Sequence, residues 1–179
     1  MRARGCWHIS SGASKEARGE GHRSEDAVLD FSAMSGYSGT PLPQKLGIKA
    51  NARVGLVRPP GDFMGTLGAL PAGVRPRLVA NGSTSFDVII CFVRAIKDVD
   101  RDVEVLRRRL DPAGGLWFAW PKKAAAKSAG ISTDVTENEI RARGLAAGLV
   151  DNKVCAIDDL WSGLRFVVRV SDRQPVRKF

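Results

Sequence analysis

Aromatic and basic side chains stand together in the stretch Trp120-Pro121-Lys122-Lys123. An aromatic wall beside two ammonium groups suits a flat anionic ligand such as a nucleotide. The alternative is structural, because a tryptophan usually belongs to the core and lysines usually face solvent. Trp120, Lys122 and Lys123 are therefore candidate ligand-binding residues.

A second candidate is the segment Thr136-Glu137-Asn138-Glu139, which has the pattern of a helix start with a capping box. Free backbone N–H groups and partial positive charge at such a start can hold a phosphate or a carboxylate. This makes Thr136 and Asn138 candidates. The alternative is ordinary capping, in which the Thr136 hydroxyl already satisfies one donor.

The third candidate is Asp158-Asp159-Leu160-Trp161. Two carboxylates beside a tryptophan could orient a ribose or act as a base, which singles out Asp158 and Trp161. The alternative is a hairpin turn with a packing tryptophan.

The chemistry available to the chain is limited by its histidines and cysteines. His8 and His22 are the two histidines, and both fall in the N-terminal tail. The remainder cannot form a Ser-His-Asp triad or a His-ligated metal site, so we expect no metal and assign no catalytic residue. Cys6, Cys91 and Cys155 are odd in number and lack paired spacing, which indicates reduced thiols in a cytoplasmic protein.

The best-defined elements form a βαβ unit. The apolar run within Phe86–Val93 predicts a strand covered on both faces. Asp98 is predicted to cap a helix that Asp111-Pro112 ends, and Gly114-Gly115 then turns the chain into a strand at Leu116–Trp120. Strand, helix and strand with short links indicate parallel strands and a right-handed crossover.

The flanking elements extend this unit into one α/β domain with a mostly parallel sheet. Alternation in Leu164–Val170 predicts a half-exposed antiparallel edge strand. Lys122–Ser132 is predicted as a loop. The other expected elements are helices at Leu42–Leu46, Asp62–Leu70 and Thr136 to about Leu149, and strands at Arg53–Val57, Arg77–Ala80 and Lys153–Ile157. Ligands bind outside the carboxyl ends of such strands, which adds Arg58, after the first strand, to the candidates.

Composition divides the chain into three parts. We expect a disordered N-terminal extension at 1–35, of which 1–33 is dispensable, an α/β domain at 36–171, and a basic tail at 172–179. The net charge is +9, and residues 1–33 hold five basic and five acidic residues, so the whole excess belongs to 34–179. Such a domain suits nucleic acid, an anionic ligand or an acidic partner, or simply has many surface arginines. No apolar run approaches the roughly 20 residues of a membrane span, and no signal peptide is present, so we expect a cytoplasmic protein without a membrane partner.

Several segments together resemble a bacterial family of uncharacterised proteins, the domain-of-unknown-function family 3052. This resemblance covers about residues 36–170 and implies no activity, because none is assigned to the family. It is carried by the segments 36–43, 45–49, 114–123, 133–138, 153–158 and 161–167.

A fainter resemblance is to the Rossmann-like class I methyltransferases. The lead-in Leu46–Val54 is similar to that of their first strand, and Phe86–Cys91 with Gly114–Phe118 is similar to their fourth and fifth strands. The resemblance implies a Rossmann-like three-layer domain and S-adenosylmethionine as a cofactor. The chain departs from the pattern at Arg58-Pro59-Pro60-Gly61, where those enzymes have a glycine-rich loop against the cofactor.

Three functions follow from these observations. The leading hypothesis is a non-catalytic methyltransferase-like domain that binds an anionic small molecule or a protein partner. The second is an S-adenosylmethionine-dependent methyltransferase with a degenerate cofactor loop, assisted by Asp158 or Asp62. The third is a basic nucleic-acid-associated protein, whose affinity would fall steeply with salt.

Overall fold

The computed structural model describes residues 39–80 and 82–173, which contain one six-stranded sheet in the order β2-β1-β3-β4-β6-β5. The strands are β1 (Val54–Val57), β2 (Arg77–Leu78), β3 (Phe86–Phe92), β4 (Leu110–Pro121), β5 (Leu149–Ala156) and β6 (Trp161–Val168). β2, β1, β3 and β4 are parallel, whereas β6 is antiparallel to both β4 and β5.

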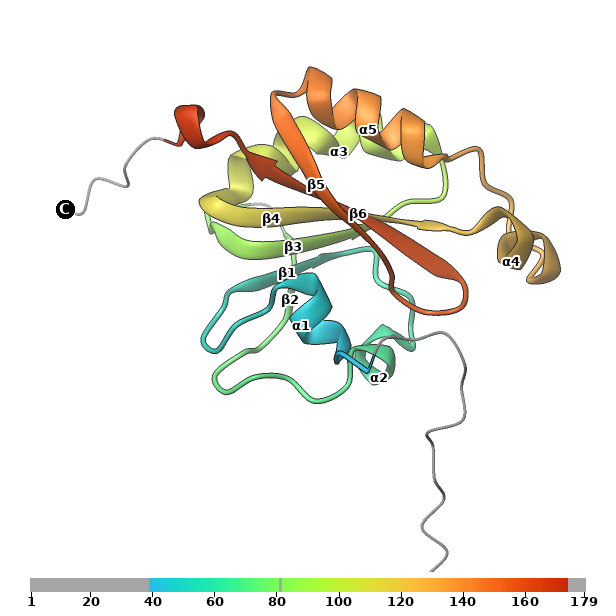
Figure 1. The fold of residues 1–179 in the computed structure, drawn as a ribbon, viewed down its shortest axis with the longest axis horizontal. Coiled ribbons are helices and arrows are strands. Elements are labelled where there is room, and N and C mark those ends of the chain that lie inside the picture. Colours follow the sequence, from blue (N-terminus) through green and yellow to red (C-terminus); the bar gives the residue numbers. More distant parts are fainter. Residues whose placement is uncertain (1–38, 81, 174–179) are drawn as a thin grey trace, which may run out of the picture. The chain divides into compact units, whose positions relative to one another are not determined.

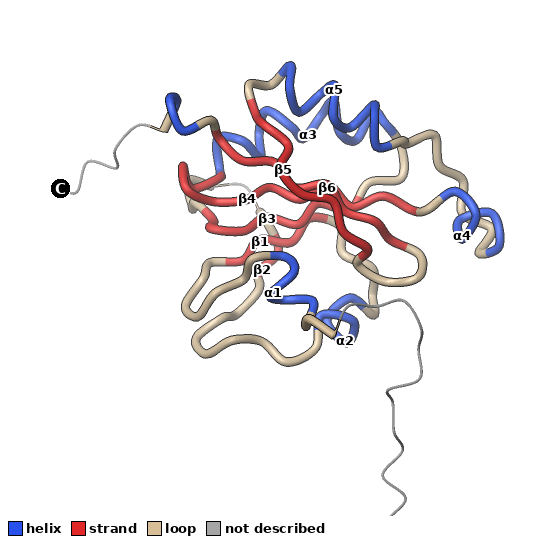
Figure 2. The backbone as a smooth tube through the Cα atoms, viewed as in Figure 1, coloured by secondary structure: helices blue, strands red, loops and turns tan. Residues whose placement is uncertain are grey.

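Helices cover both faces of this sheet (Figures 1 and 2). α3 and α5 lie side by side on one face, and α1 and α2 lie on the other. The helices are α1 (Leu42–Leu46), α2 (Phe63–Leu67), α3 (Ile96–Arg109), α4 (Lys123–Ser128) and α5 (Glu137–Ala146), and a 3-10 turn follows at Val170–Asp172.

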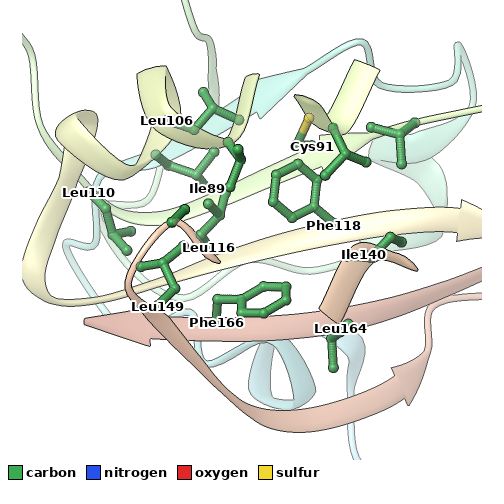
Figure 3. Close-up of a cluster of buried hydrophobic side chains, with 14 of the residues drawn as sticks. Ile89, Cys91, Leu106, Leu110, Leu116, Phe118, Ile140, Leu149, Leu164 and Phe166 are labelled. Atoms are coloured by element: carbon green, nitrogen blue, oxygen red, sulfur yellow. The ribbon is translucent and has the colours of Figure 1, made fainter. Parts of the chain in front are cut away.

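β3 lies between two hydrophobic cores and contributes to both. Ile89 and Cys91 point into the core under α3 and α5, where Phe118 and Phe166 meet edge to face with their ring centroids 6.1 Å apart (Figure 3). Val88, Ile90 and Phe92 point into the core under α1 and α2. A continuous apolar strand is therefore required here, because neither face of β3 meets solvent.

The order of the strands reverses at β1. β2 pairs with one side of β1 and β3 with the other, so the chain must cross β1 between Leu78 and Phe86. The crossing is close, because a Cβ added at Gly55 would lie 2.7 Å from Val79 and 3.0 Å from Phe86. Gly55 thus lets seven residues make a connection that usually contains a helix.

The predicted start of α3 is wrong. The helix begins at Ile96, two residues before Asp98, and its N-cap Ala95 has no side-chain oxygen. The cap comes from elsewhere in the chain: Asp134 Oδ1 accepts the Ile96 N–H over 2.8 Å. Sequence spacing cannot show such a cap, because the two residues are 38 positions apart.

The predicted end of α3 lies within two residues of the observed end at Arg109, but the predicted turn is wrong, because no turn separates the helix from the next strand. β4 begins at Leu110 and pairs with Phe86, and the register then shifts so that Gly115 lies opposite Val88. The residues between bulge from the ladder, where Asp111 pairs with Arg53 over 3.1 Å. Arg53 in turn pairs with Asp87 over 2.7 Å, which fixes the bulge.

Other predictions of extent or position are also wrong: β5 begins at Leu149 rather than Lys153, and α5 ends at Ala146 rather than at about Leu149. Lys122–Ser132 is not a loop throughout, because Lys123–Ser128 forms α4 around the buried Ala126. The strand predicted at Leu164–Val170 is β6, which lies inside the sheet between β4 and β5, so β5 is the edge strand. Arg165 misled the prediction: its position in the alternation indicated solvent, yet it lies half-buried on an interior strand.

The predicted class, an α/β domain with a mostly parallel sheet and an antiparallel edge, is confirmed by this topology. Residues 1–38 and 174–179 lie outside the described residues, so the predicted extension and tail stay predictions. Among the described helices, none has the length and apolar character needed to cross a membrane.

Gly144 on α5 gives a test of the packing. A Cβ there would lie 2.2 Å from the ring of Phe166, which is fully buried, so Gly144→Ala should destabilise the protein by about 1–3 kcal/mol even though alanine favours a helix. Gly65→Ala on α2 is the matched control, since open space surrounds that position and the change should stabilise by up to about 1 kcal/mol. Urea unfolding measures both, and equal stability of the two variants would contradict the packing of α5.

Candidate functional site

Four connections meet at one end of the sheet. β1, β3 and β4 all end there, and Pro121 at the end of β4 lies opposite Trp161 at the start of β6, which brings the β5–β6 turn to the same end. One hollow opens at this end on one face of the sheet, and two adjoining hollows open on the other face. They divide the sequence-predicted residues into two groups.

The first hollow has a volume of about 430 Å³ and lies on the face covered by α3 and α5. We call it the Trp120 hollow. It brings together four predicted residues from two separate segments. Its lining consists of Trp120, Lys123, Val135, Thr136, Glu137 and Asn138.

The start of α5 is ordered as the sequence predicts. Thr136 accepts the Glu139 N–H over 3.4 Å, and the Glu139 carboxylate accepts the Thr136 N–H over 3.2 Å. This capping box satisfies the N–H of Glu139 but leaves those of Glu137 and Asn138 without an acceptor in the described part of the chain.

The second group lines what we call the Trp161 crevice, two adjoining hollows of about 410 and 250 Å³ on the α2 face. Pro60, Arg94 and Trp161 line both of them. Arg58 and Asp98 complete the smaller hollow, and the larger one also has Asp62, Asp158 and Asp159 in its lining. The crevice lies where the strand order reverses, the usual ligand position of an open α/β sheet.

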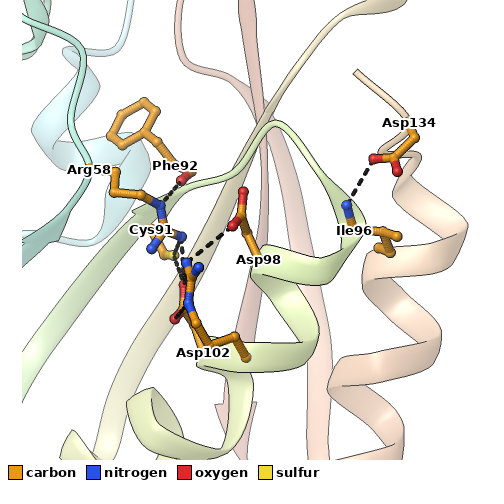
Figure 4. Close-up of polar contacts among 8 residues, drawn as sticks. Arg58, Cys91, Phe92, Ile96, Asp98, Asp102 and Asp134 are labelled. Carbon is orange, nitrogen blue, oxygen red and sulfur yellow. Dashed lines mark hydrogen bonds and ion pairs between the residues drawn. The ribbon is translucent and has the colours of Figure 1, made fainter. Parts of the chain in front are cut away.

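Arg58 spans the crevice floor rather than leaving it open. Its guanidinium donates to the Phe92 carbonyl over 3.1 Å, to Cys91 Sγ over 3.3 Å and to Asp102 Oδ2 over 2.5 Å (Figure 4). Its backbone has a φ of +49°, a left-handed conformation that is costly for a residue with a side chain, and all the more so before a proline. These contacts hold the strained backbone of Arg58 in place. A glycine at this position would have no strain and would leave the space of the side chain empty.

The charge of Asp102 depends on this arrangement. Burial raises the pKa of Asp102, but hydrogen bonds and positive charge from Arg101 and Arg58 outweigh burial and hold the pKa below its usual range. Cys91, beneath the pair, responds in the opposite direction, because burial raises the pKa of its thiol to about 12. Cys91 is thus a buried thiol and a poor nucleophile near neutral pH.

Two predicted residues have structural contacts. Asp158 Oδ1 accepts the N–H groups of Leu160 and Trp161 over 2.8 and 2.6 Å, which closes the β5–β6 turn. Lys122 Nζ donates to the Asp158 carbonyl over 2.7 Å and so joins β4 to that turn. Lys122 is therefore directed away from the Trp120 hollow, whereas Lys123 lines it.

Sequence reasoning placed Arg94 in a candidate loop, Arg94–Lys97, but did not select it as a ligand-binding residue, and it missed Asp102. Arg94 follows β3 and lies over the Trp161 ring, 5.9 Å from its centroid, and no described carboxylate is within ion-pairing distance of it. Its place directly after a buried strand was the available signal. No sequence signal marks Asp102, because a carboxylate in the second turn of a helix is common. Among the described residues, no group of three His, Cys, Asp or Glu side chains could hold a metal ion.

Comparisons with known proteins give a likeness of fold. No protein-family model matches the chain, and no curated protein sequence matches it. The resemblance to family 3052 therefore stays a prediction.

Among solved structures, similar chains include magnesium protoporphyrin IX methyltransferase from Synechocystis PCC 6803 with bound SAH, at 14% identity, 67% of this chain, 75% of that chain and a TM-score of 0.47. Fibrillarin from Aeropyrum pernix with S-adenosyl-L-methionine is 14% identical, and the match covers 72% of this chain and 69% of that chain with a TM-score of 0.44. An S-adenosylmethionine-dependent methyltransferase from Clostridium acetobutylicum is 11% identical, and the match covers 54% of this chain and 67% of that chain with a TM-score of 0.40. TM-scores below 0.5 carry no conclusion about this chain, so its fold rests on its own strand order.

Asp102→Asn tests the contacts of Arg58. A lowered carboxyl pKa adds stability that is present above the unfolded pKa of about 4 and is lost as the pH falls through the folded pKa. The variant should lose about 1–2 kcal/mol at pH 7, a value between those of exposed and buried ion pairs, and the deficit should shrink toward pH 2.

Glu104→Gln on the exposed side of the same helix is the control and should unfold like the wild type at every pH. Urea titrations across the pH range provide the measurement. A deficit of Asp102→Asn that stays constant down to pH 2 would show that the charge of Asp102 does not matter.

Proposed function

We propose that this chain is a non-catalytic binding domain and that its ligand is a small anionic molecule held in the Trp120 hollow. One observation carries the proposal. Lys123, and Glu137 and Asn138 with their open N–H groups, line the same hollow as Trp120, a core residue of which 7% is exposed.

The charges of the hollow support an anion. Glu137 contributes a carboxylate, but Arg141 neutralises it over 2.5 Å, and Glu139 is occupied by Thr136. Lys123 has no carboxylate partner among the described residues, and the dipole of α5 adds partial positive charge. A flat group against Trp120 with a phosphate or carboxylate at the helix start fits this arrangement.

The size of the hollow favours a small molecule over the protein partner that the charge alone would allow. A volume of about 430 Å³ lies within the range of small-molecule sites. The non-catalytic part of the proposal rests on the Trp161 crevice, where Arg58 and Asp102 occupy the floor and Cys91 is protonated.

Titration calorimetry with AMP, a flat base joined to a phosphate, tests the binding site. Lys123→Ala should weaken AMP binding at least about tenfold, because it removes the ammonium group from the hollow. Lys127→Ala, one turn further along α4 and also exposed, removes the same charge outside the lining and should bind like the wild type. An equal loss of AMP affinity in both variants would show that only the overall positive charge matters. An unchanged affinity in both variants would show that AMP does not bind in the Trp120 hollow.

The second candidate function is an S-adenosylmethionine-dependent methyltransferase. It is favoured by the crevice at the point of strand reversal, where Trp161 offers an aromatic wall and Asp62 and Asp158 offer carboxylates. Arg58 stands against it, because its side chain occupies the floor where a glycine loop would admit a cofactor.

Calorimetry with S-adenosylhomocysteine separates the two functions. We expect no binding by the wild type and measurable binding by Arg58→Gly, which removes the guanidinium and accepts the left-handed backbone without strain. Micromolar binding by the wild type would put the methyltransferase first. Absence of binding in both proteins would show that the crevice is not a cofactor site.

A further inference from the structure

Arg165, a half-buried arginine on β6, has no carboxylate partner among residues 39–80 and 82–173. Arg165 Nη1 donates to Asn152 Oδ1 over 3.3 Å, and Nε is buried without an acceptor. No ion pair within the described residues involves Arg165, although most buried or half-buried cations require one. A buried N–H donor without an acceptor lowers the stability of the folded protein, and an added acceptor would remove this penalty.

Gly115 on the neighbouring strand makes room for this guanidinium. A Cβ at Gly115 would lie 2.4 Å from Arg165 Nε and 2.7 Å from Nη2, so any side chain would displace the guanidinium. The absence of a side chain lets the planar group lie flat on β4. Arg165 is thus held in one place by the sheet instead of extending freely into solvent.

Two further positive residues are associated with Arg165. Lys153 lies directly opposite Arg165 in the β5–β6 ladder, and burial together with the charge of Arg173 lowers the pKa of Arg165. Arg173 is anchored by a hydrogen bond from Nε to the Val168 carbonyl over 3.1 Å. Asp151 cannot compensate, because it pairs with Arg141 of α5 on the other face of the sheet.

We propose that Arg165 and Arg173, with the amide of Asn152, form a binding site for a phosphoryl group. Guanidinium groups present paired N–H donors whose spacing matches phosphate oxygens, and the dianion would neutralise both cations at once. This site lies on the α1 face toward the ends of β6 and β4 remote from the Trp120 hollow, so it is independent of the proposed function.

Thermal unfolding of the full chain in inorganic phosphate, against chloride at equal ionic strength, tests the site. We expect phosphate to raise the Tm by about 2–4 °C, the effect of a ligand near ten times its Kd. Arg165→Met should remove this increment. Without phosphate the same variant should unfold at or above the wild-type temperature, because it relieves an unpaired cation.

Two more variants distinguish a site from bulk charge. Arg173→Ala removes the second cation together with its hydrogen bond to the Val168 carbonyl, and it should also abolish the phosphate increment. Arg169→Ala removes an exposed charge four residues away in the sequence and should keep it. A phosphate increment that survives in Arg165→Met and Arg173→Ala, or its absence from the wild type, would overturn the proposal.

The phosphoryl group could belong to a small molecule or to a nucleic-acid backbone, and the same variants separate these sources. Fluorescence anisotropy with labelled decathymidylate measures the second. Binding that Arg173→Ala weakens, and that inorganic phosphate competes away, assigns the site to nucleic acid. A phosphate increment with no oligonucleotide binding assigns it to a small phosphorylated molecule.

Discussion

The fold depends on one constraint, the burial of β3 on both faces. A strand with no solvent face can carry no polar side chain along most of its length. The apolar side chains on its two faces therefore belong to two separate cores. Its position also fixes the end of the molecule at which the candidate site lies. Because β1 and β4 must pair with β3 in parallel, the connections after all three strands converge at one edge.

Local sequence signals identified the elements whose information is local. The apolar run of β3, the helical stripe of α3 and the capping box at Thr136 each act through neighbours within a few residues, and each predicted the right kind of element. Errors arose where a distant residue decides the outcome. Asp134 moves the start of α3, and Arg53 holds the bulge that turns a predicted helix stop into strand.

The candidate site shows the same division. Trp120, Lys123, Thr136 and Asn138 were selected from separate motifs, and the structure brings them together because β4 ends and α5 begins at the same edge. The sequence did not indicate that Lys122 points elsewhere, because its partner, the Asp158 carbonyl, is 36 positions away. The contacts of Arg58 with Asp102 were also invisible, because 44 positions separate the two residues.

The two edges of the sheet differ in how they resist aggregation. β2 contributes only two residues and offers too few free backbone groups to recruit a strand from another molecule. β5 is eight residues long, but a register shift between Asp151 and Lys153 and the charges of those residues interrupt it as a template. The short crossing over Gly55 therefore leaves a two-residue strand at this edge of the sheet, which limits the addition of a strand from another molecule.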